Sequence, residues 1–128
     1  MTKRFIVPAL FLFVSLLSAS LFLPAQAPAQ GHRVCFYEHI NYQGRSACWE
    51  PGSEVPDLTQ LWHQNMGWND VISSISLEGY ATATIYEHIN YGGASVYIGT
   101  NIPDMRYLQY DDGSVWNWND VVSSLIVY

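Results

Sequence analysis

Beyond residue 30 the chain alternates short apolar runs with polar stretches that contain asparagine and glycine. Short runs rich in aromatic and β-branched residues are typical of β-strands, and an Asn/Gly-rich stretch between two such runs predicts an antiparallel hairpin. No segment in this part of the chain shows the 3.6-residue period of a helix. Two hairpins are therefore predicted, the first with strands at 34–37 and 47–49 around a turn at 41–44, the second with strands at 84–86 and 95–98 around a turn at 90–93.

Two further strands are predicted at 72–77 and 121–127, where serine is interleaved with aliphatic residues. Gly44 and Gly93 close the turns of the two hairpins. Glycine adopts a positive φ angle without steric cost, and a tight hairpin needs such a residue. We therefore expect both glycines to have positive φ.

The second half of the chain repeats the first. The stretch FYEHINYQG at 36–44 returns as IYEHINYGG at 85–93, and WND at 68–70 returns at 118–120. The offset changes from 49 to 50 residues, which places insertions and deletions in loops within each unit. Two matching all-β units predict a sandwich of two antiparallel sheets with pseudo-twofold symmetry.

Residues 1–29 have the pattern of a secretory signal peptide. Two basic residues precede an apolar stretch at 5–23, and small residues follow it. We expect cleavage before Gln30, which leaves a single, secreted domain at 30–128. Cleavage after Ala27 is an alternative, and so is an uncleaved membrane anchor, because the apolar stretch approaches the length of a membrane span.

The charge of the mature domain restricts its partners. All 11 carboxylates lie after residue 30, where three arginines and no lysine oppose them, so the formal charge is 3 − 11 = −8. Nucleic acids and anionic membranes attract proteins through Lys and Arg. We therefore expect no nucleic-acid partner and no membrane association after signal cleavage. An acidic surface of this kind suits cations.

Cys35 and Cys48 are the two cysteines of the chain, and they fall on the two strands of the first hairpin. Outside the cytosol such a pair is typical of a disulfide. A redox role is the weaker interpretation, because the sequence has no Cys-x-x-Cys motif. We predict a structural disulfide in the first hairpin, which the second hairpin lacks.

The repeated stretches GWNDVISSI at 67–75 and NWNDVVSSL at 117–125 carry the chemistry of a candidate cation site. Calcium takes six to eight oxygen ligands from carboxylates, carbonyls, hydroxyls and water. Each copy offers an amide and a carboxylate from Asn-Asp and a hydroxyl three residues after the Asp, which makes four or five ligands with backbone carbonyls. The alternative is ordinary turn chemistry, in which Asn and Asp bond their own backbone.

Both copies also share the pattern aromatic-x-x-x-x-aromatic-x-Gly, as Tyr37 to Gly44 and Tyr86 to Gly93. Followed in each copy by Asn-Asp-x-x-Ser-Ser, this pattern resembles the paired Greek key motifs of the βγ-crystallin superfamily, in its calcium-binding microbial branch. The resemblance implies two four-stranded Greek keys, at about 33–79 and 82–128. It also implies that Ser74 and Ser124 tie down the folded hairpins.

In similar domains the two motifs exchange calcium ligands across the twofold axis, with a backbone carbonyl from a hairpin. Both copies match the pattern at all its defined positions, so two calcium ions are predicted, and which aspartate serves which site is left open. The ligands that the resemblance implies are Asn69, Asp70, Ser73, Asn119, Asp120 and Ser123, with the carbonyls near Glu38 and Glu87.

Other functions are predicted less strongly. The fold is also similar to that of a family of bacterial metalloprotease inhibitors, which makes a secreted peptidase inhibitor the alternative function. Its partner would be a secreted protease, reached through loops at 52–67 or 107–116. A cell-surface partner bound through a tryptophan patch near Trp116 is a third hypothesis, although these rings more often fill a core. Zinc at His39 and His88 needs more ligands than the pair provides, and no catalytic motif predicts an enzyme.

Overall fold

The computed structural model describes residues 31–63, 66–112 and 116–128. The predicted signal peptide lies outside the described residues, as do residues 64–65 and 113–115 of the two loops proposed for a protease. Apart from four short 3₁₀ elements, the regular structure of the described residues is β, as the apolar pattern predicted. No helix in these residues is long and apolar enough to cross a membrane.

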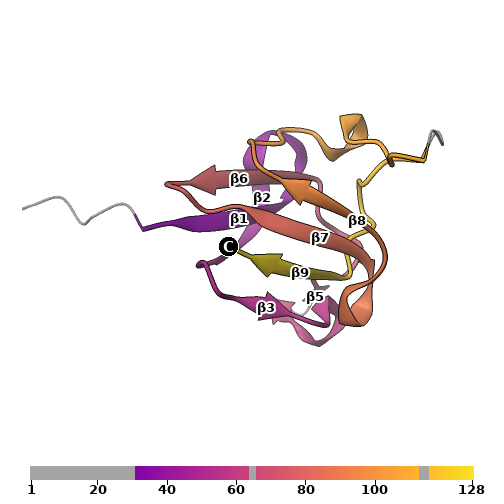
Figure 1. The fold of residues 1–128 in the computed structure, drawn as a ribbon, viewed down its shortest axis with the longest axis horizontal. Helices are drawn as coiled ribbons and strands as arrows, with labels where there is room; N and C mark the ends of the chain where they lie inside the picture. The colour runs from indigo at the N-terminus through magenta and orange to yellow at the C-terminus, as the bar shows by residue number, and fades with distance from the viewer. Residues whose placement is uncertain (1–30, 64–65, 113–115) are drawn as a thin grey trace, which may run out of the picture.

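Two antiparallel sheets form the fold (Figure 1). The first has the order β2-β1-β6 and the second β3-β9-β7-β8, with a separate two-stranded ribbon β4-β5. This is the predicted all-β sandwich. The strands are β1 (Arg33–His39), β2 (Gln43–Trp49), β3 (Glu54–Val55), β4 (Trp62–His63), β5 (Met66–Gly67), β6 (Ser74–Glu78), β7 (Ala83–His88), β8 (Gly92–Ile98) and β9 (Ser124–Val127).

The two repeats exchange strands between the sheets. Strand β3 belongs to the first repeat but pairs with β9 of the second. Reciprocally, Ile102 of the second repeat pairs with Ile75 of β6, with N···O distances of 2.9 and 2.8 Å in the two directions. The fourth strand of the first sheet is thus reduced to a single bridge, whereas the second sheet has four strands.

The hairpins fold as the glycine pattern predicted. Each turn is a short 3₁₀ element, η1 (Ile40–Tyr42) or η3 (Ile89–Tyr91). Gly44 has φ +81° and Gly93 has φ +72°. A Cβ atom at Gly44 would lie 2.7 Å from Cδ2 of His39, so a side chain there would force the His39 ring to move as well as strain the backbone.

A buried serine clamps each hairpin, as the resemblance implied. The hydroxyl of Ser74 accepts a hydrogen bond from the backbone N–H of Tyr42 at 3.0 Å and donates one to the carbonyl of His39 at 2.6 Å. Ser124 makes the same two bonds in the second hairpin, at 3.0 and 2.6 Å. Both serines are fully buried.

The strands predicted to begin at residues 72 and 121 begin later, at Ser74 and Ser124. The reason is a long-range bond that the local pattern does not contain. The carbonyl of Ile72 accepts from the backbone N–H of Asp120, and the carbonyl of Val122 accepts from that of Asp70. These carbonyls therefore bond to the loop of the other repeat instead of to a neighbouring strand.

The core lies between the sheets and holds aliphatic and aromatic side chains from both repeats. Trp68 and Trp118 belong to it, being 3 % and 1 % exposed. Trp116, by contrast, is 72 % exposed. Two of the tryptophans near the Asn-Asp motifs therefore fill the core, and among the tryptophans whose burial is described only Trp116 is exposed.

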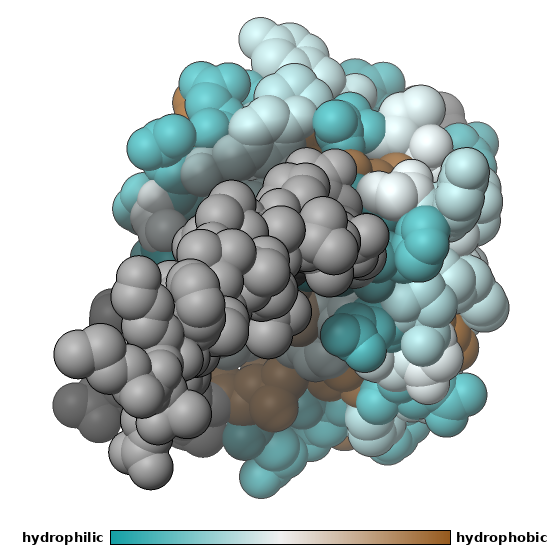
Figure 2. All heavy atoms as spheres, turned by 90° about the vertical axis from the view of Figure 1, so that its left-hand side faces the viewer, coloured by the Kyte–Doolittle hydropathy of each residue, from teal (hydrophilic) through white to brown (hydrophobic). Residues whose placement is uncertain are grey.

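Cys35 and Cys48 form the predicted disulfide, at directly opposed positions of β1 and β2. Closing the loop between them stabilises the fold by roughly 3 kcal/mol in the chain-entropy model. The face shown in Figure 2 is mostly hydrophilic where its residues are coloured, with small apolar areas. This agrees with the excess of carboxylates in the sequence.

Candidate metal centre

The two Asn-Asp motifs form equivalent turns in which the aspartate has an unusual backbone. Asp70 and Asp120 both have φ +56°. Asn and Asp are the residues, apart from glycine, that enter this left-handed region most readily. The conformation brings each aspartate N–H to a carbonyl of the other repeat, 3.2 Å away at Val122 and 3.1 Å away at Ile72. The turns therefore meet across the pseudo-twofold axis.

The side chains cross in the same way. The hydroxyl of Ser73 donates to Oδ1 of Asp120 at 3.2 Å, and the hydroxyl of Ser123 donates to Oδ1 of Asp70 at 3.4 Å. The sequence left open which aspartate meets which motif. In the structure each aspartate lies beside the serine of the other repeat. We call these two groups the Asp70 cup (Asn69, Asp70, Ser123) and the Asp120 cup (Asn119, Asp120, Ser73).

Each cup contains a buried oxygen with no hydrogen-bond partner among the described residues. These atoms are Oδ1 of Asn69 and Oδ1 of Asn119. Their orientation is fixed by chemistry, because Nδ2 of each asparagine donates to Oδ2 of the adjacent aspartate at 2.7 Å. Turning either amide over would set two acceptors against each other. An unsatisfied buried acceptor costs about 1–3 kcal/mol, so a cation or a donor is needed to complete each cup.

The oxygen types of the cups match a hard cation. Each cup provides a carboxylate, an amide oxygen and a hydroxyl, which are calcium ligands. No group of three or more His, Cys, Asp or Glu side chains gathers around one point in the described part of the chain.

The charged form of Asp70 is disfavoured in its cup. Burial raises the pKa of the Asp70 carboxyl above its ordinary value, and the charge of Asp120 adds to the rise. Hydrogen bonds from Ser123 and Asn69 act in the opposite direction. A bound cation would oppose both effects, because an opposite charge nearby favours the charged form of a carboxylate.

Glu38 and Glu87 lie at the bulges of the two hairpins. The register of β1 with β2 shifts between Tyr37 and His39, and that of β7 with β8 shifts between the matching residues of the second repeat. A bulge takes a backbone carbonyl out of the ladder. The preceding carbonyl, of Tyr37, holds the backbone N–H of Ser73 at 2.9 Å. The Glu38 backbone is therefore next to the Asp120 cup, and Glu87 has the same relation to the Asp70 cup.

The side chains of these glutamates have a separate role that the sequence analysis missed. Glu38 binds the guanidinium of Arg45 through both of its oxygens, with Oε2 at 3.1 Å from Nε and Oε1 at 3.2 Å from Nη2. The hydrogen bonds from Arg45 lower the pKa of Glu38. At the position of Arg45 the second repeat has Ala94. This difference is visible in the aligned repeats, as QGRS against GGAS.

The chain is similar to known proteins in sequence. The model of peptidase inhibitor family I36 matches residues 24–98. Spherulin-3A from Physarum polycephalum is 31% identical over 100 residues, which span 78% of this chain and 84% of that protein.

Solved structures show the same fold. A chain solved in work on the evolution of the eye lens βγ-crystallin domain fold has a TM-score of 0.59 and 28% identity, covering 79% of this chain and 88% of the other. A double mutant of a βγ-crystallin domain from Clostridium beijerinckii has a TM-score of 0.56 and 31% identity, covering 75% and 96%.

A further structure shows metal on this fold. A double mutant of clostrillin in complex with nickel has a TM-score of 0.54 and 27% identity, covering 75% of this chain and 97% of the other. Neither the crystallin fold family nor the inhibitor family consists of enzymes. The chain belongs to peptidase inhibitor family I36 and has the βγ-crystallin domain fold.

Proposed function

We propose that the protein is an exported βγ-crystallin-type module that binds two calcium ions and is stabilised by them. The observation that carries this proposal is the pair of buried, unpartnered Oδ1 atoms of Asn69 and Asn119. They occur at equivalent places, each beside a carboxylate and a hydroxyl. If the two asparagines served only to stabilise their turns, we would expect their side-chain oxygens to have hydrogen-bond donors. Only the amide nitrogens have partners, namely the carboxylates of the adjacent aspartates.

Each ion would be held by ligands from both repeats. In the Asp70 cup these are Asn69, Asp70 and Ser123, with the carbonyl near Glu87. The Asp120 cup offers the matching set, including Ser73 and the carbonyl near Glu38. Calcium would bridge the two repeats and oppose their separation. Export is part of the proposal, because extracellular modules bind calcium at millimolar concentrations and the disulfide suits an oxidising compartment.

The stabilisation follows from linkage. A ligand that binds only the native state adds RT ln(1 + [L]/Kd), which is about 1.4 kcal/mol per site at ten times Kd and about 2.7 kcal/mol at a hundred times Kd. Extracellular calcium modules have Kd values of roughly 10⁻⁴–10⁻³ M. At 10 mM calcium the two sites together therefore add about 2.8 kcal/mol or more. Since about 1 kcal/mol corresponds to roughly 4–8 °C in a domain of this size, we expect the melting temperature to rise by about 10 °C or more.

The test is isothermal titration of calcium into the chelator-stripped chain without residues 1–29. The wild type should bind two ions. Asp70→Asn should lose one, and Asp70→Asn with Asp120→Asn should lose both. Ser123→Ala should add little to Asp70→Asn, because both residues belong to one cup. Asp57→Asn, at a turn outside both cups, is the matched control and should bind two. No heat and no thermal stabilisation at 10 mM calcium would reject the proposal.

Peptidase inhibition is the second candidate, and the match of family I36 over residues 24–98 favours it. Its test is the rate at which secreted metallopeptidases hydrolyse a peptide substrate in the presence of the purified chain. Exposed side chains in the loop at 107–116, such as Tyr107 at 84 % and Trp116 at 72 %, are the first to replace by alanine. Inhibition that survives replacement in both 52–67 and 107–116 would exclude these loops as the contact surface.

A further inference from the structure

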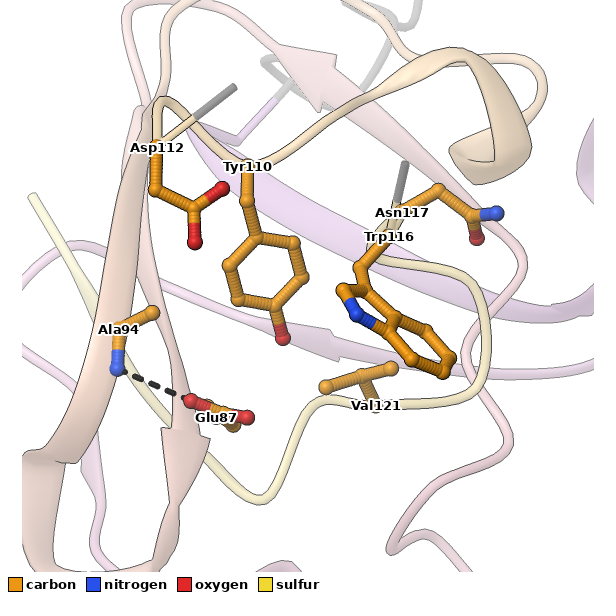
Figure 3. A pocket seen from close by; sticks show the side chains of 7 residues that line it. All are labelled: Glu87, Ala94, Tyr110, Asp112, Trp116, Asn117 and Val121. Atoms are coloured by element: carbon orange, nitrogen blue, oxygen red, sulfur yellow. Dashed lines mark hydrogen bonds between the residues drawn. The ribbon is translucent and has the colours of Figure 1, made fainter. Parts of the chain in front are cut away.

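The second repeat contains a pocket where the first repeat has an arginine side chain. Its volume is about 430 Å³, which is within the range of small-ligand sites. Figure 3 shows the side chains that line it, which are Glu87, Ala94, Tyr110, Asp112, Trp116, Asn117 and Val121. The hydroxyl of Tyr110 points toward the end of the pocket where Glu87, Val121 and Trp116 lie.

The first repeat shows how an arginine side chain is held at the equivalent position. There the Arg45 guanidinium binds both oxygens of Glu38 and lies over the ring of Trp68, with Cζ 5.1 Å from the ring centroid. Arg45 is 8 % exposed and Glu38 is 18 % exposed. An arginine at this place is thus held by a bidentate carboxylate and an aromatic face, the two features that bind guanidinium best.

The carboxylate of Glu87 has the same backbone support as that of Glu38. Oε2 of Glu38 accepts from the N–H of Arg45 at 3.4 Å, and Oε2 of Glu87 accepts from the N–H of Ala94 at 3.2 Å. The acceptor is therefore oriented alike in both repeats. Because Ala94 has no guanidinium to cover it, the Glu87 side chain is 35 % exposed, about twice as much as Glu38.

The remaining lining residues make the pocket negative and aromatic. Asp112 adds a second carboxylate to its rim. Burial raises the pKa of the Tyr110 hydroxyl, and the negative charges of Glu87 and Asp112, with a hydrogen bond from the hydroxyl to Glu87, add to the rise. Tyr110 stacks on Trp118, with centroids 4.6 Å apart, and so takes the aromatic face that Arg45 covers in the first repeat. An incoming cation would instead meet Tyr110 and the exposed ring of Trp116.

We propose that this pocket binds an arginine side chain of a partner polypeptide, with Glu87 as the bidentate acceptor and Trp116 and Tyr110 as the walls. Charge complementarity and the Arg45–Glu38 pair identify the occupant. The proposal is independent of calcium, because it uses the carboxylate of Glu87, whereas the Asp70 cup would use its backbone carbonyl. It is compatible with a protease partner but does not require one.

The test is titration of the chain with the peptide acetyl-Gly-Arg-Gly-amide, followed by tryptophan fluorescence and by backbone amide shifts in NMR spectra. The citrulline peptide has nearly the same shape without charge, and the lysine peptide has charge without the planar fork. We expect the arginine peptide to bind at least tenfold more tightly than the citrulline peptide, with shifts at Glu87 and Trp116. Equal binding of the two peptides would overturn the proposal.

Two substitutions locate the site. Ala94→Arg should fill the pocket from within, as Arg45 does, and abolish peptide binding while it raises the melting temperature. Ser95→Arg adds the same charge at an exposed neighbouring position of β8 and is its matched control. Glu87→Gln should weaken binding about tenfold or more, since it removes a charge-assisted bidentate pair. Unchanged binding by either Ala94→Arg or Glu87→Gln would place the peptide elsewhere and overturn the proposal.

Discussion

Replacement of Ser124 by alanine is a direct test of how the second hairpin is held. Its hydroxyl is fully buried and joins the backbone N–H of Tyr91 to the carbonyl of His88. Alanine removes both bonds and leaves both backbone groups without that partner. Each lost hydrogen bond is worth about 1 kcal/mol net. We therefore expect the free energy of unfolding to fall by about 2 kcal/mol.

Urea unfolding followed by tryptophan fluorescence measures this loss. With an m-value of about 1.5 kcal/mol per M, a change of about 2 kcal/mol lowers the midpoint by about 1.3 M. Ser95→Ala, at an exposed position of β8, is the control and should leave the midpoint within about 0.3 M of the wild type, because exposed substitutions cost little. A midpoint for Ser124→Ala as close to the wild type as that would refute the role of the clamp.

The matching variant Ser74→Ala distinguishes the two hairpins. It should lower the midpoint by a similar amount, because the same two bonds are lost. Local opening should differ, since the Cys35–Cys48 disulfide joins β1 to β2 and nothing equivalent joins β7 to β8. Amide hydrogen exchange should accelerate across β7 and β8 in Ser124→Ala more than across β1 and β2 in Ser74→Ala. Equal acceleration would mean that the disulfide does not limit hairpin opening.

Three further predictions concern single features. Gly93→Ala should lower the free energy of unfolding by about 1–3 kcal/mol, because its φ is +72°; a thermal melt checks this, and an unchanged melting temperature would contradict it. Replacing Cys35 and Cys48 together by serine should cost roughly 3 kcal/mol, read from urea midpoints, with no further loss on adding reductant. Hydrogen bonds from Arg106 lower the pKa of Asp104. The stabilisation from this carboxylate is therefore present above the pKa of unfolded Asp and is lost as pH falls through the lowered value. An NMR pH titration should show the Asp104 pKa rising in Arg106→Ala.

The sequence was sufficient for features determined by neighbouring residues. The hairpins and their glycines follow from local turn chemistry, and the serine clamps follow from the family pattern. The starts of β6 and β9 could not be predicted in the same way. They depend on the carbonyls of Ile72 and Val122, which bond to the opposite repeat across the axis. A local pattern contains no information about a partner some fifty residues away.

Some features of the candidate site could likewise be predicted from the sequence, and others could not. The residue types of the cups were readable, since Asn-Asp and Ser occur at fixed spacing in both repeats. The pairing of Asp70 with Ser123 was not, because equal motifs related by pseudo-symmetry permit either arrangement until the backbone is placed. The sequence did contain one indication of the pocket beside Glu87, because the second repeat has Ala94 where the first repeat has Arg45. Its walls, however, include Tyr110, Asp112 and Trp116, which lie outside the repeated motifs.

Pseudo-symmetry thus separates two kinds of binding on one small domain. Where both repeats keep the same residues, at Asn-Asp-x-x-Ser-Ser, the structure has two equivalent cups, and a function of those residues should appear twice. Where the repeats differ, at Arg45 and Ala94, the first repeat satisfies its own glutamate and the second leaves a carboxylate exposed in a pocket. A function of that difference should appear once. Calcium stoichiometry and arginine-peptide binding therefore report on different residues, and neither result determines the other.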